Sequence, residues 1–331
     1  MFILESYPTA VFFCVITMLC WGSWANTQKL ASTHWRFELF YWDYVIGILM
    51  LSLLFAFTLG SNGSQGRNFL EDVNQAGGNN LFSAILGGII FNAANILLVA
   101  AISIAGMSVA FPVGIGIALV LGVVVNYIDS PKGNPTILFA GVALIALAII
   151  LNARAYKKML SGSATTSAKG LMLSVVAGLL MGFFYRFVAS AMFTDFTLPE
   201  TGKLSPYTAM VFFAIGILLS NFLFNTYIMR KPFAGSPVHF SQYLKGSFRN
   251  HLTGILGGII WCIGMSFSII ASGKAGAAIS YGLGQGATVV AAIWGIFIWR
   301  EFKDAPKGTS ILLNSMLLLY IIGIALIIYA R

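Results

Sequence analysis

Two ionisable side chains lie well inside apolar runs of this sequence, and their chemistry suggests proton movement and ligand binding. Asp43 lies between Trp42 and Tyr44, where an unpaired carboxylate would cost several kcal/mol. Arg186 lies in the run FFYRFVASA, where its guanidinium can bind carbonyl oxygens of a ligand or extend along its stem to the polar surface. We therefore expect Asp43 to take up and release a coupling proton, and Arg186 to contact a substrate.

Amide, indole and phenol side chains inside the apolar runs form a second set of candidates. Amides that face lipid are costly, so Asn92, Asn95 and Gln285 are expected to face a cavity or another helix. Tyr281 and Gln285 share a helix face because they are four residues apart. Two alternatives stay open: indoles near the headgroups can form an interfacial belt, and the two asparagines can join helices by hydrogen bonds. The expected substrate-binding residues are Trp21, Trp24, Asn26, Gln28, Asn92, Asn95, Tyr185, Arg186, Trp261, Tyr281 and Gln285.

The composition of the chain is that of a membrane protein. Its 331 residues are 58% hydrophobic and only 9% charged, with a mean hydropathy of +0.88, whereas soluble domains are about 25% charged. Strands of a membrane barrel are roughly ten residues long and alternate in polarity, which these apolar runs do not. Because a helix needs roughly 20 apolar residues to cross the hydrocarbon, we expect an all-α integral membrane protein with ten transmembrane helices. Their predicted spans are 8–30, 37–60, 80–103, 106–127, 135–153, 169–193, 206–229, 250–272, 275–299 and 309–330.

One stretch of the sequence occurs twice, which indicates an internal duplication. The motif LGGII begins at Leu86 and at Leu256, an offset of 170 residues, and the same offset aligns Gly114 with Gly284. Because each half holds five helices, the second half must enter the membrane upside down relative to the first. We expect a first repeat at 1–155, a short cytoplasmic linker at 156–168 and a second repeat at 169–331. A substrate cavity is expected between them, formed by the first, third, sixth and eighth helices and part of the ninth.

Small residues recur every four positions on two of the predicted helices. Such stripes let helix backbones approach closely, so we interpret them as packing seams and as candidate surfaces for a homodimer. They comprise Gly106, Ala110, Gly114, Ala118 and Gly122 in the first half, and Gly276, Ser280, Gly284, Thr288 and Ala292 in the second.

The net charge of +9 is explained by loop charges better than by a nucleic-acid partner. Loops after odd-numbered helices carry thirteen basic residues, and those on the other side carry five. Because basic loops stay in the cytoplasm, we expect both termini outside it in a multi-pass protein of the cell membrane. The N-terminal segment has Glu5 and no basic residue before the first apolar run, which is unlike a cleaved signal peptide.

Neither a cofactor nor a metal site is expected, and the chain is not expected to be an enzyme. Cys14, Cys20 and Cys262 all fall inside predicted helices, so their pattern indicates neither a disulfide framework nor a thiolate metal site. Glycine pairs such as Gly114 and Gly116 are not preceded by a strand, as a dinucleotide-binding loop would require.

Several features together resemble a known transporter family. The first predicted helix ends in CWGSW at 20–24 and the second opens with WDY at 42–44. With ten helices and outside termini, this resembles the ureide permease family of the drug/metabolite transporter superfamily. The neighbouring sugar-uptake families, including the L-rhamnose/proton symporters, have a similar plan. Plant ureide permeases that the chain resembles carry a central phosphate-loop motif, whereas here the segment GSATTSAKG at 162–170 lacks the required spacing.

The resemblance implies a secondary active transporter, with proton-coupled uptake of a small neutral polar solute such as a ureide, nucleobase, nucleoside or sugar. Its partners would be that solute, a proton and the lipid bilayer, with no nucleic acid. A drug or metabolite exporter of the same superfamily is an alternative. A membrane scaffold or a receptor that does not transport is another, although neither needs duplicated halves or a buried Asp43. A channel is disfavoured because the sequence contains no repeated carbonyl filter motif.

Overall fold

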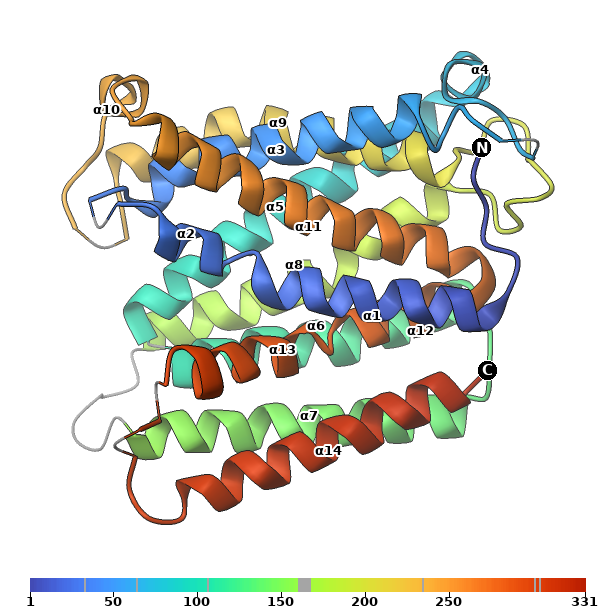
Figure 1. Cartoon of the computed structure of the whole chain (residues 1–331). Helices are drawn as coiled ribbons and strands as arrows, with labels where there is room; N and C mark the ends of the chain where they lie inside the picture. The colour runs from blue at the N-terminus through green and yellow to red at the C-terminus, as the bar shows by residue number, and fades with distance from the viewer. Residues whose placement is uncertain are drawn as a thin grey trace.

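A computed structural model describes the chain except for residues 33, 64, 106, 160–167, 234, 301 and 304, and the side chains of 107–109, 111, 112 and 159. Its described part is a bundle of helices (Figure 1). The first half contains α1 Tyr7–Ser23, α2 Asn26–Leu30, α3 Phe37–Phe57, α4 Phe69–Gln75, α5 Gly78–Ala105, α6 Met107–Asp129 and α7 Pro135–Met159. The second contains α8 Ala168–Ala191, α9 Pro206–Arg230, α10 Phe240–Leu244, α11 Phe248–Ala275, α12 Ala277–Gly284, α13 Ala287–Ile293, the π-helical turn η1 Trp294–Ile298 and α14 Thr309–Tyr329.

Many of these helices are long and apolar enough to cross a membrane. Among the described residues, eight helical stretches meet this criterion, and α12, α13 and η1 together count as one of them. Two shorter apolar helices, Tyr7–Ser23 and Val113–Asp129, overlap the first and fourth predicted spans. The chain is therefore an all-helical, multi-pass membrane protein.

Local sequence signals set where several of these helices begin. The hydroxyl of Ser6 accepts a hydrogen bond from the backbone N–H of Thr9, and Ser205 caps α9 in the same way through Thr208. A serine oxygen at this position satisfies one of the free N–H groups of the first turn. Ser247 does the same for α11, so three of the described apolar helices have a serine at their N-terminal cap.

The long helices run alongside one another, and both chain termini lie at the same end of the bundle (Figure 1). The short helix α4 lies at this end, whereas α2 and α10 lie at the opposite end. At one edge of the bundle α7 packs against α14. We call the end with both termini and α4 the terminal end, and the opposite end, with α2 and α10, the α10 end.

The duplicated stretch forms corresponding helices in the two halves. Helices α5 and α11 each contain 28 residues, and both their first and last residues are 170 positions apart. Their packing also corresponds: α5 packs against α8 and α9, and α11 packs against α1 and α3. Similar sequences thus form similar helices with similar neighbours.

The glycines of the LGGII motif explain why these helices cross so closely. A Cβ atom added at Gly88 would overlap a backbone carbonyl of α9, and one added at Gly258 would overlap a backbone carbonyl of α3. The opposing helices contribute Gly216 and Gly47, whose added Cβ atoms would overlap carbonyls of α5 and α11. Glycine is needed at these four positions because any side chain would push the helices apart.

The small-residue stripes do not provide the dimer surface that we considered. The described members of both stripes are buried within the chain, where Gly114 lies against α5 and α8, and Gly122 against the ring of Tyr281. The stripes are therefore used for packing inside the protomer. Gly106, the first member, lies outside the described residues, as does most of the expected linker.

Three parts of the chain differ from the predicted spans: two helices are interrupted, and a segment between two spans contains a short helix. The first predicted helix is interrupted at Trp24 and Ala25, between α1 and α2. The ninth is interrupted at Gln285 and Gly286, between α12 and α13, and ends in η1. The loop at 60–80 contains α4, which begins with a capping box formed by the side chains of Asn68 and Glu71, a signal that the sequence already carried.

Candidate functional site

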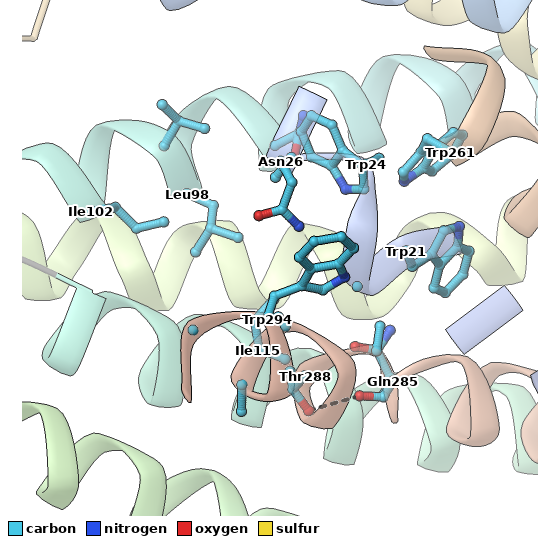
Figure 2. A pocket seen from close by; sticks show the side chains of 18 of the residues that line it. Trp21, Trp24, Asn26, Leu98, Ile102, Ile115, Trp261, Gln285, Thr288 and Trp294 are labelled. Atoms are coloured by element: carbon cyan, nitrogen blue, oxygen red, sulfur yellow. Dashed lines mark hydrogen bonds between the residues drawn. The ribbon is translucent and has the colours of Figure 1, made fainter. Parts of the chain in front are cut away.

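A cavity of about 430 Å³ lies among the helices, within the roughly 300–1,000 Å³ typical of small-molecule sites. It extends from Trp261, halfway along α11, to Lys29, Tyr156 and Trp299 near the α10 end. Figure 2 shows Trp21 and Trp261 at one side of this space, and Leu98 and Ile102 at the other.

Most of the expected substrate-binding residues line this cavity. They come from α1 and its interruption, from α2, from the middle of α5 and α11, and from the junction of α12 with α13. These lining residues are Trp21, Trp24, Asn26, Gln28, Asn95, Trp261 and Gln285.

The two interrupted helices bring their polar residues to the cavity wall. After the interruption in α1, the Thr27 N–H bonds the Trp24 carbonyl, three residues back instead of four. At the α12–α13 junction the Gly286 N–H likewise bonds the Leu283 carbonyl. Interrupted helices leave backbone groups that need other partners, and in membranes these occur where a protein cavity supplies them.

Aromatic rings make one wall of the cavity rigid. The Trp21 and Trp261 rings stack with centroids 6.0 Å apart and an interplanar angle of 14°. Phe91 packs 4.4 Å from Trp261 on one side, and Tyr44 packs 4.6 Å from Trp24. Such a wall offers flat apolar faces to a solute without a large loss of side-chain entropy on binding.

Two tryptophans that were not among the expected site residues, Trp294 and Trp299, also line the cavity. The Trp294 indole N–H donates to Ser23 Oγ at 2.9 Å, and the Trp299 indole N–H donates to Asn26 Oδ1 at 2.7 Å. Asn26 also donates to the Ser23 carbonyl, so both ends of its amide hold the helix interruption against η1. The signal available in the sequence was a second tryptophan cluster at the end of a helix, like the cluster that ends the first helix.

A chain of buried polar side chains lies behind the cavity. The Asn95 amide nitrogen donates to Tyr41 Oη at 3.1 Å, and Tyr41 donates to Asn92 Oδ1 at 2.9 Å. Asn92 in turn donates to Ser220 Oγ on α9 at 2.9 Å. Asn92 therefore does not line the cavity, but it is joined to Asn95, which does.

Two expected tyrosines lie beyond the cavity wall, where they join helices. The Tyr185 hydroxyl donates to the Ser268 carbonyl at 3.2 Å. The Tyr281 hydroxyl lies 3.1 Å from the Ala118 carbonyl and 3.0 Å from the Met181 carbonyl. Both tyrosines are fully buried, and their hydroxyls hold α6, α8, α11 and α12 together.

Arg186 is placed away from the cavity, contrary to the expectation that it contacts a substrate there. Its guanidinium is 48% exposed and lies 3.2 Å from the carboxylate of Asp129, at the last residue of α6. The long stem of arginine lets the charge leave the apolar layer, and a carboxylate at the surface receives it. This was the alternative that the sequence left open.

Asp43 is buried in a separate cluster at the α10 end, outside the cavity lining. Only 2% of its surface is exposed, and its carboxylate accepts a hydrogen bond from the Tyr243 hydroxyl at 2.7 Å. The Nδ1 atom of His251 lies 3.0 Å from each carboxylate oxygen. Burial and the neighbouring carboxylate raise the pKa of Tyr243, which keeps this phenol protonated as a donor. Neither partner was found from the sequence, because both lie about 200 residues away.

Within the described part of the chain, no group of three metal-binding side chains comes together. The cysteines are unpaired thiols, with Cys14 and Cys262 buried. The cavity lining contributes indole, amide, phenol and aliphatic side chains, of which the indoles can stack on a flat ring and the amides can form hydrogen bonds.

Comparisons with known proteins place these features in context. A family model described as ureide permease matches residues 40–165 and 152–330. Ureide permease 1 from Arabidopsis thaliana is 23% identical, across 99% of this chain and 98% of that relative. The glucose uptake protein GlcU from Bacillus subtilis (strain 168) is 28% identical, across 71% of this chain and 74% of its own. One crystal structure with 15% sequence identity has the same fold, with a TM-score of 0.61 over 97% of this chain and 96% of the other.

Proposed function

Because this chain belongs to the ureide permease family and is a membrane transporter of small polar solutes, we propose that it takes up a neutral heterocycle by proton symport. The solute class is a ureide or a nucleobase. The observation that carries this proposal is the cavity lining, which combines stacked indoles with amides. Among the described lining residues Lys29 is the one with a charged side chain, and its ammonium lies over the Trp299 ring.

The lining suits a planar solute with several hydrogen-bonding groups. The partly exposed Trp24 ring can stack on a flat ring of the solute, and Asn95 and Gln285 supply amide groups. Among the described residues the Gln285 side chain has no hydrogen-bond partner, so its amide is available to a ligand. A cationic solute would lose its hydration in this space without gaining a counter-charge, which is costly. Of the lining residues that the structure describes, an anionic solute would meet a cation only at Lys29, near the α10 end of the cavity and over the Trp299 ring.

A sugar is the second candidate, favoured by the likeness to a protein named for glucose uptake. Amides also bind sugar hydroxyls, and indole faces can pack against the C–H face of a sugar ring. Uptake of a nucleoside would combine both kinds of contact.

A ligand screen by thermal unfolding of the purified protein distinguishes these candidates. A compound that binds only the folded state at 100 times its Kd adds about 2.7 kcal/mol of stability. We expect allantoin or uracil to raise the melting temperature, and glucose or L-rhamnose to have a smaller effect. Orotate, which is uracil with an added carboxylate, is the matched charged control and should have no effect. Stabilisation by orotate but not uracil would contradict a site for neutral solutes.

Ten membrane spans in two inverted repeats, 1–155 and 169–331, account best for the arrangement of the helices. The shared offset of α5 and α11 and the reciprocal contacts of Gly88 and Gly258 support this organisation. The short apolar helices α1 and α6 would be the two further spans. Residues 156–168 would then link the two repeats.

The orientation that we propose places both termini outside the cytoplasm. The basic residues Arg36, Arg230, Lys231 and Arg249 lie next to α3, α9 and α11 at the α10 end, which would be cytoplasmic. The cavity reaches toward this end. On the side of the cavity that faces the terminal end, the Tyr185 hydroxyl contacts α11. The structure would then represent an inward-facing state.

Proton coupling is assigned to Asp43 together with His251. Their contact joins α3 to α11, two helices that also meet at Gly258. A proton held between a carboxylate and an imidazole would change the charge of this contact during the transport cycle. An exporter would use the same parts in the opposite direction. A scaffold or receptor would leave the cavity and the interrupted helices without a purpose.

A further inference from the structure

We propose that Asn95 presents its carbonyl oxygen, and not its amino group, to the cavity, and that Tyr41 is the positioning residue that fixes this orientation. The transporter would then select solutes that offer an N–H or O–H donor to this point. The inference rests on the proposed function, since it concerns recognition of that solute. It is carried by the hydrogen-bond chain behind the cavity.

The direction of this chain is determined at its far end by a backbone carbonyl. A carbonyl oxygen can only accept, so the atom of Asn92 that lies 3.3 Å from the Ile217 carbonyl must be the amide nitrogen. The same nitrogen lies 2.9 Å from Ser220 Oγ. Ser220 donates its own proton to the Gly216 carbonyl at 2.7 Å, so it accepts from Asn92. Both contacts of Asn92 on α9 thus require its amino group.

The orientation of Asn92 then determines which way the Tyr41 proton points. With its nitrogen toward α9, Asn92 turns Oδ1 toward the Tyr41 hydroxyl, 2.9 Å away. Because Oδ1 has no proton, Tyr41 must donate to it. Tyr41 is fully buried and has a single hydroxyl proton, so toward its other neighbour its oxygen can only accept.

The last member of the chain is Asn95, which must offer a donor to Tyr41. Its Nδ2 lies 3.1 Å from Tyr41 Oη, and its side chain lines the cavity. The opposite rotation would set the Asn95 carbonyl against an oxygen that has no proton left, inside the protein. A buried pair of acceptors without a donor is strongly disfavoured. The Asn95 oxygen therefore remains available to the solute.

This arrangement distinguishes solutes that differ in a single hydrogen-bond donor. A ring N–H or a hydroxyl can donate to the Asn95 oxygen, whereas an N-methyl group or a missing hydroxyl cannot. A lost hydrogen bond that leaves a buried acceptor unsatisfied corresponds to roughly a tenfold loss of affinity. The wild-type protein should therefore bind one donor-blocked analogue at least about tenfold more weakly than the parent compound.

The experiment compares parent and donor-blocked ligands on purified variants by equilibrium binding. Uracil is paired with 1-methyluracil and 3-methyluracil, allantoin with its N-methyl derivatives, and glucose with its monodeoxy derivatives. In Tyr41→Phe the Asn95 amide can rotate, so the ratio of parent to blocked-analogue affinity should fall from about tenfold or more toward 1. Tyr207→Phe is the matched control, because Tyr207 is also buried and its hydroxyl bonds the Phe2 carbonyl, remote from the cavity.

Asn95→Ala is a second variant that tests the inference even if Tyr41→Phe fails to fold. Asn95→Ala should bind the parent and the blocked analogue about equally and weakly, whatever happens to Tyr41→Phe. A ratio that stays at the wild-type value in either folded variant would overturn the inference while leaving the proposed function intact. Failure of the wild-type protein to bind any parent compound would overturn the proposed function and this inference with it.

Discussion

The imidazole of His251 contacts the carboxylate of Asp43 through Nδ1, which lies 3.0 Å from each carboxylate oxygen, although the two residues are 208 positions apart in the chain. The contact joins the beginning of α3 to the beginning of α11, beside the Tyr243 hydroxyl of α10. Both helices also contribute residues to the cavity lining, Phe37 from α3 and Trp261 from α11.

Replacement of Asp43 tests this coupling. Asp43→Asn keeps the size of the side chain and removes its proton site, so accumulation driven by a pH gradient should be lost while substrate exchange remains measurable. One proton that moves down a gradient of one pH unit releases about 1.4 kcal/mol, which corresponds to roughly tenfold accumulation in the wild type. The measurement is uptake into proteoliposomes with an imposed gradient, with Glu200→Gln, an exposed position, as control. Undiminished accumulation in Asp43→Asn would remove the assignment.

Truncation of the cavity wall should weaken binding without unfolding the protein. Trp24→Ala removes a stacking face and Gln285→Ala removes an amide, and each should lower affinity by about tenfold. Titration calorimetry with the stabilising ligand measures the effect. Trp42→Phe is the matched control, because Trp42 is buried against Met229 and does not line the cavity. If both cavity variants bind like the wild type, these side chains have only a packing role.

The close helix crossings predict a stability difference between chemically identical substitutions. Gly88→Ala and Gly258→Ala place a methyl group against a backbone carbonyl, so each should destabilise the fold by about 1–3 kcal/mol. Gly116→Ala adds the same methyl group where no atom lies within 4 Å, and it should have little effect. Melting temperatures in detergent give the comparison. Equal melting temperatures for all three variants would contradict the packing account.

Cysteine labelling tests the orientation in the membrane. In a background without Cys14, Cys20 and Cys262, a reagent that cannot cross the membrane should label Asn62→Cys in intact cells. It should label Ser241→Cys only after the cells are opened. Both positions are exposed, and they lie in the loop after α3 at the terminal end and in α10 at the other end. The reverse pattern would place the termini in the cytoplasm.

The parts of the fold that depend on local sequence could be predicted before the structure was known. Apolar runs of sufficient length predicted most of the membrane helices, and the repeated LGGII motif predicted that α5 and α11 correspond. The polar end of the first helix predicted cavity residues, because amides such as Gln28 are costly in lipid wherever the helix packs. These inferences needed only properties of single segments.

The parts that depend on contacts between distant segments could not be predicted in this way. Nothing near Arg186 in the sequence indicates that Asp129 would receive its charge at the surface. His251 reaches Asp43 only because α11 packs on α3. The interruption at Trp24 is held by Trp294 and Trp299 of a helix some 270 residues away, so local propensity could not reveal it.

The most direct test of the central claim is uptake of radiolabelled uracil, allantoin and glucose into proteoliposomes that contain the wild-type protein or Trp24→Ala. The account predicts saturable uptake of at least one of these neutral solutes by the wild type, inhibited by an excess of the same unlabelled compound but not by orotate. It also predicts that Trp24→Ala raises the half-saturating concentration by about tenfold. Uptake no greater than in protein-free liposomes for every neutral solute, or equal uptake by both proteins at all concentrations, would contradict it.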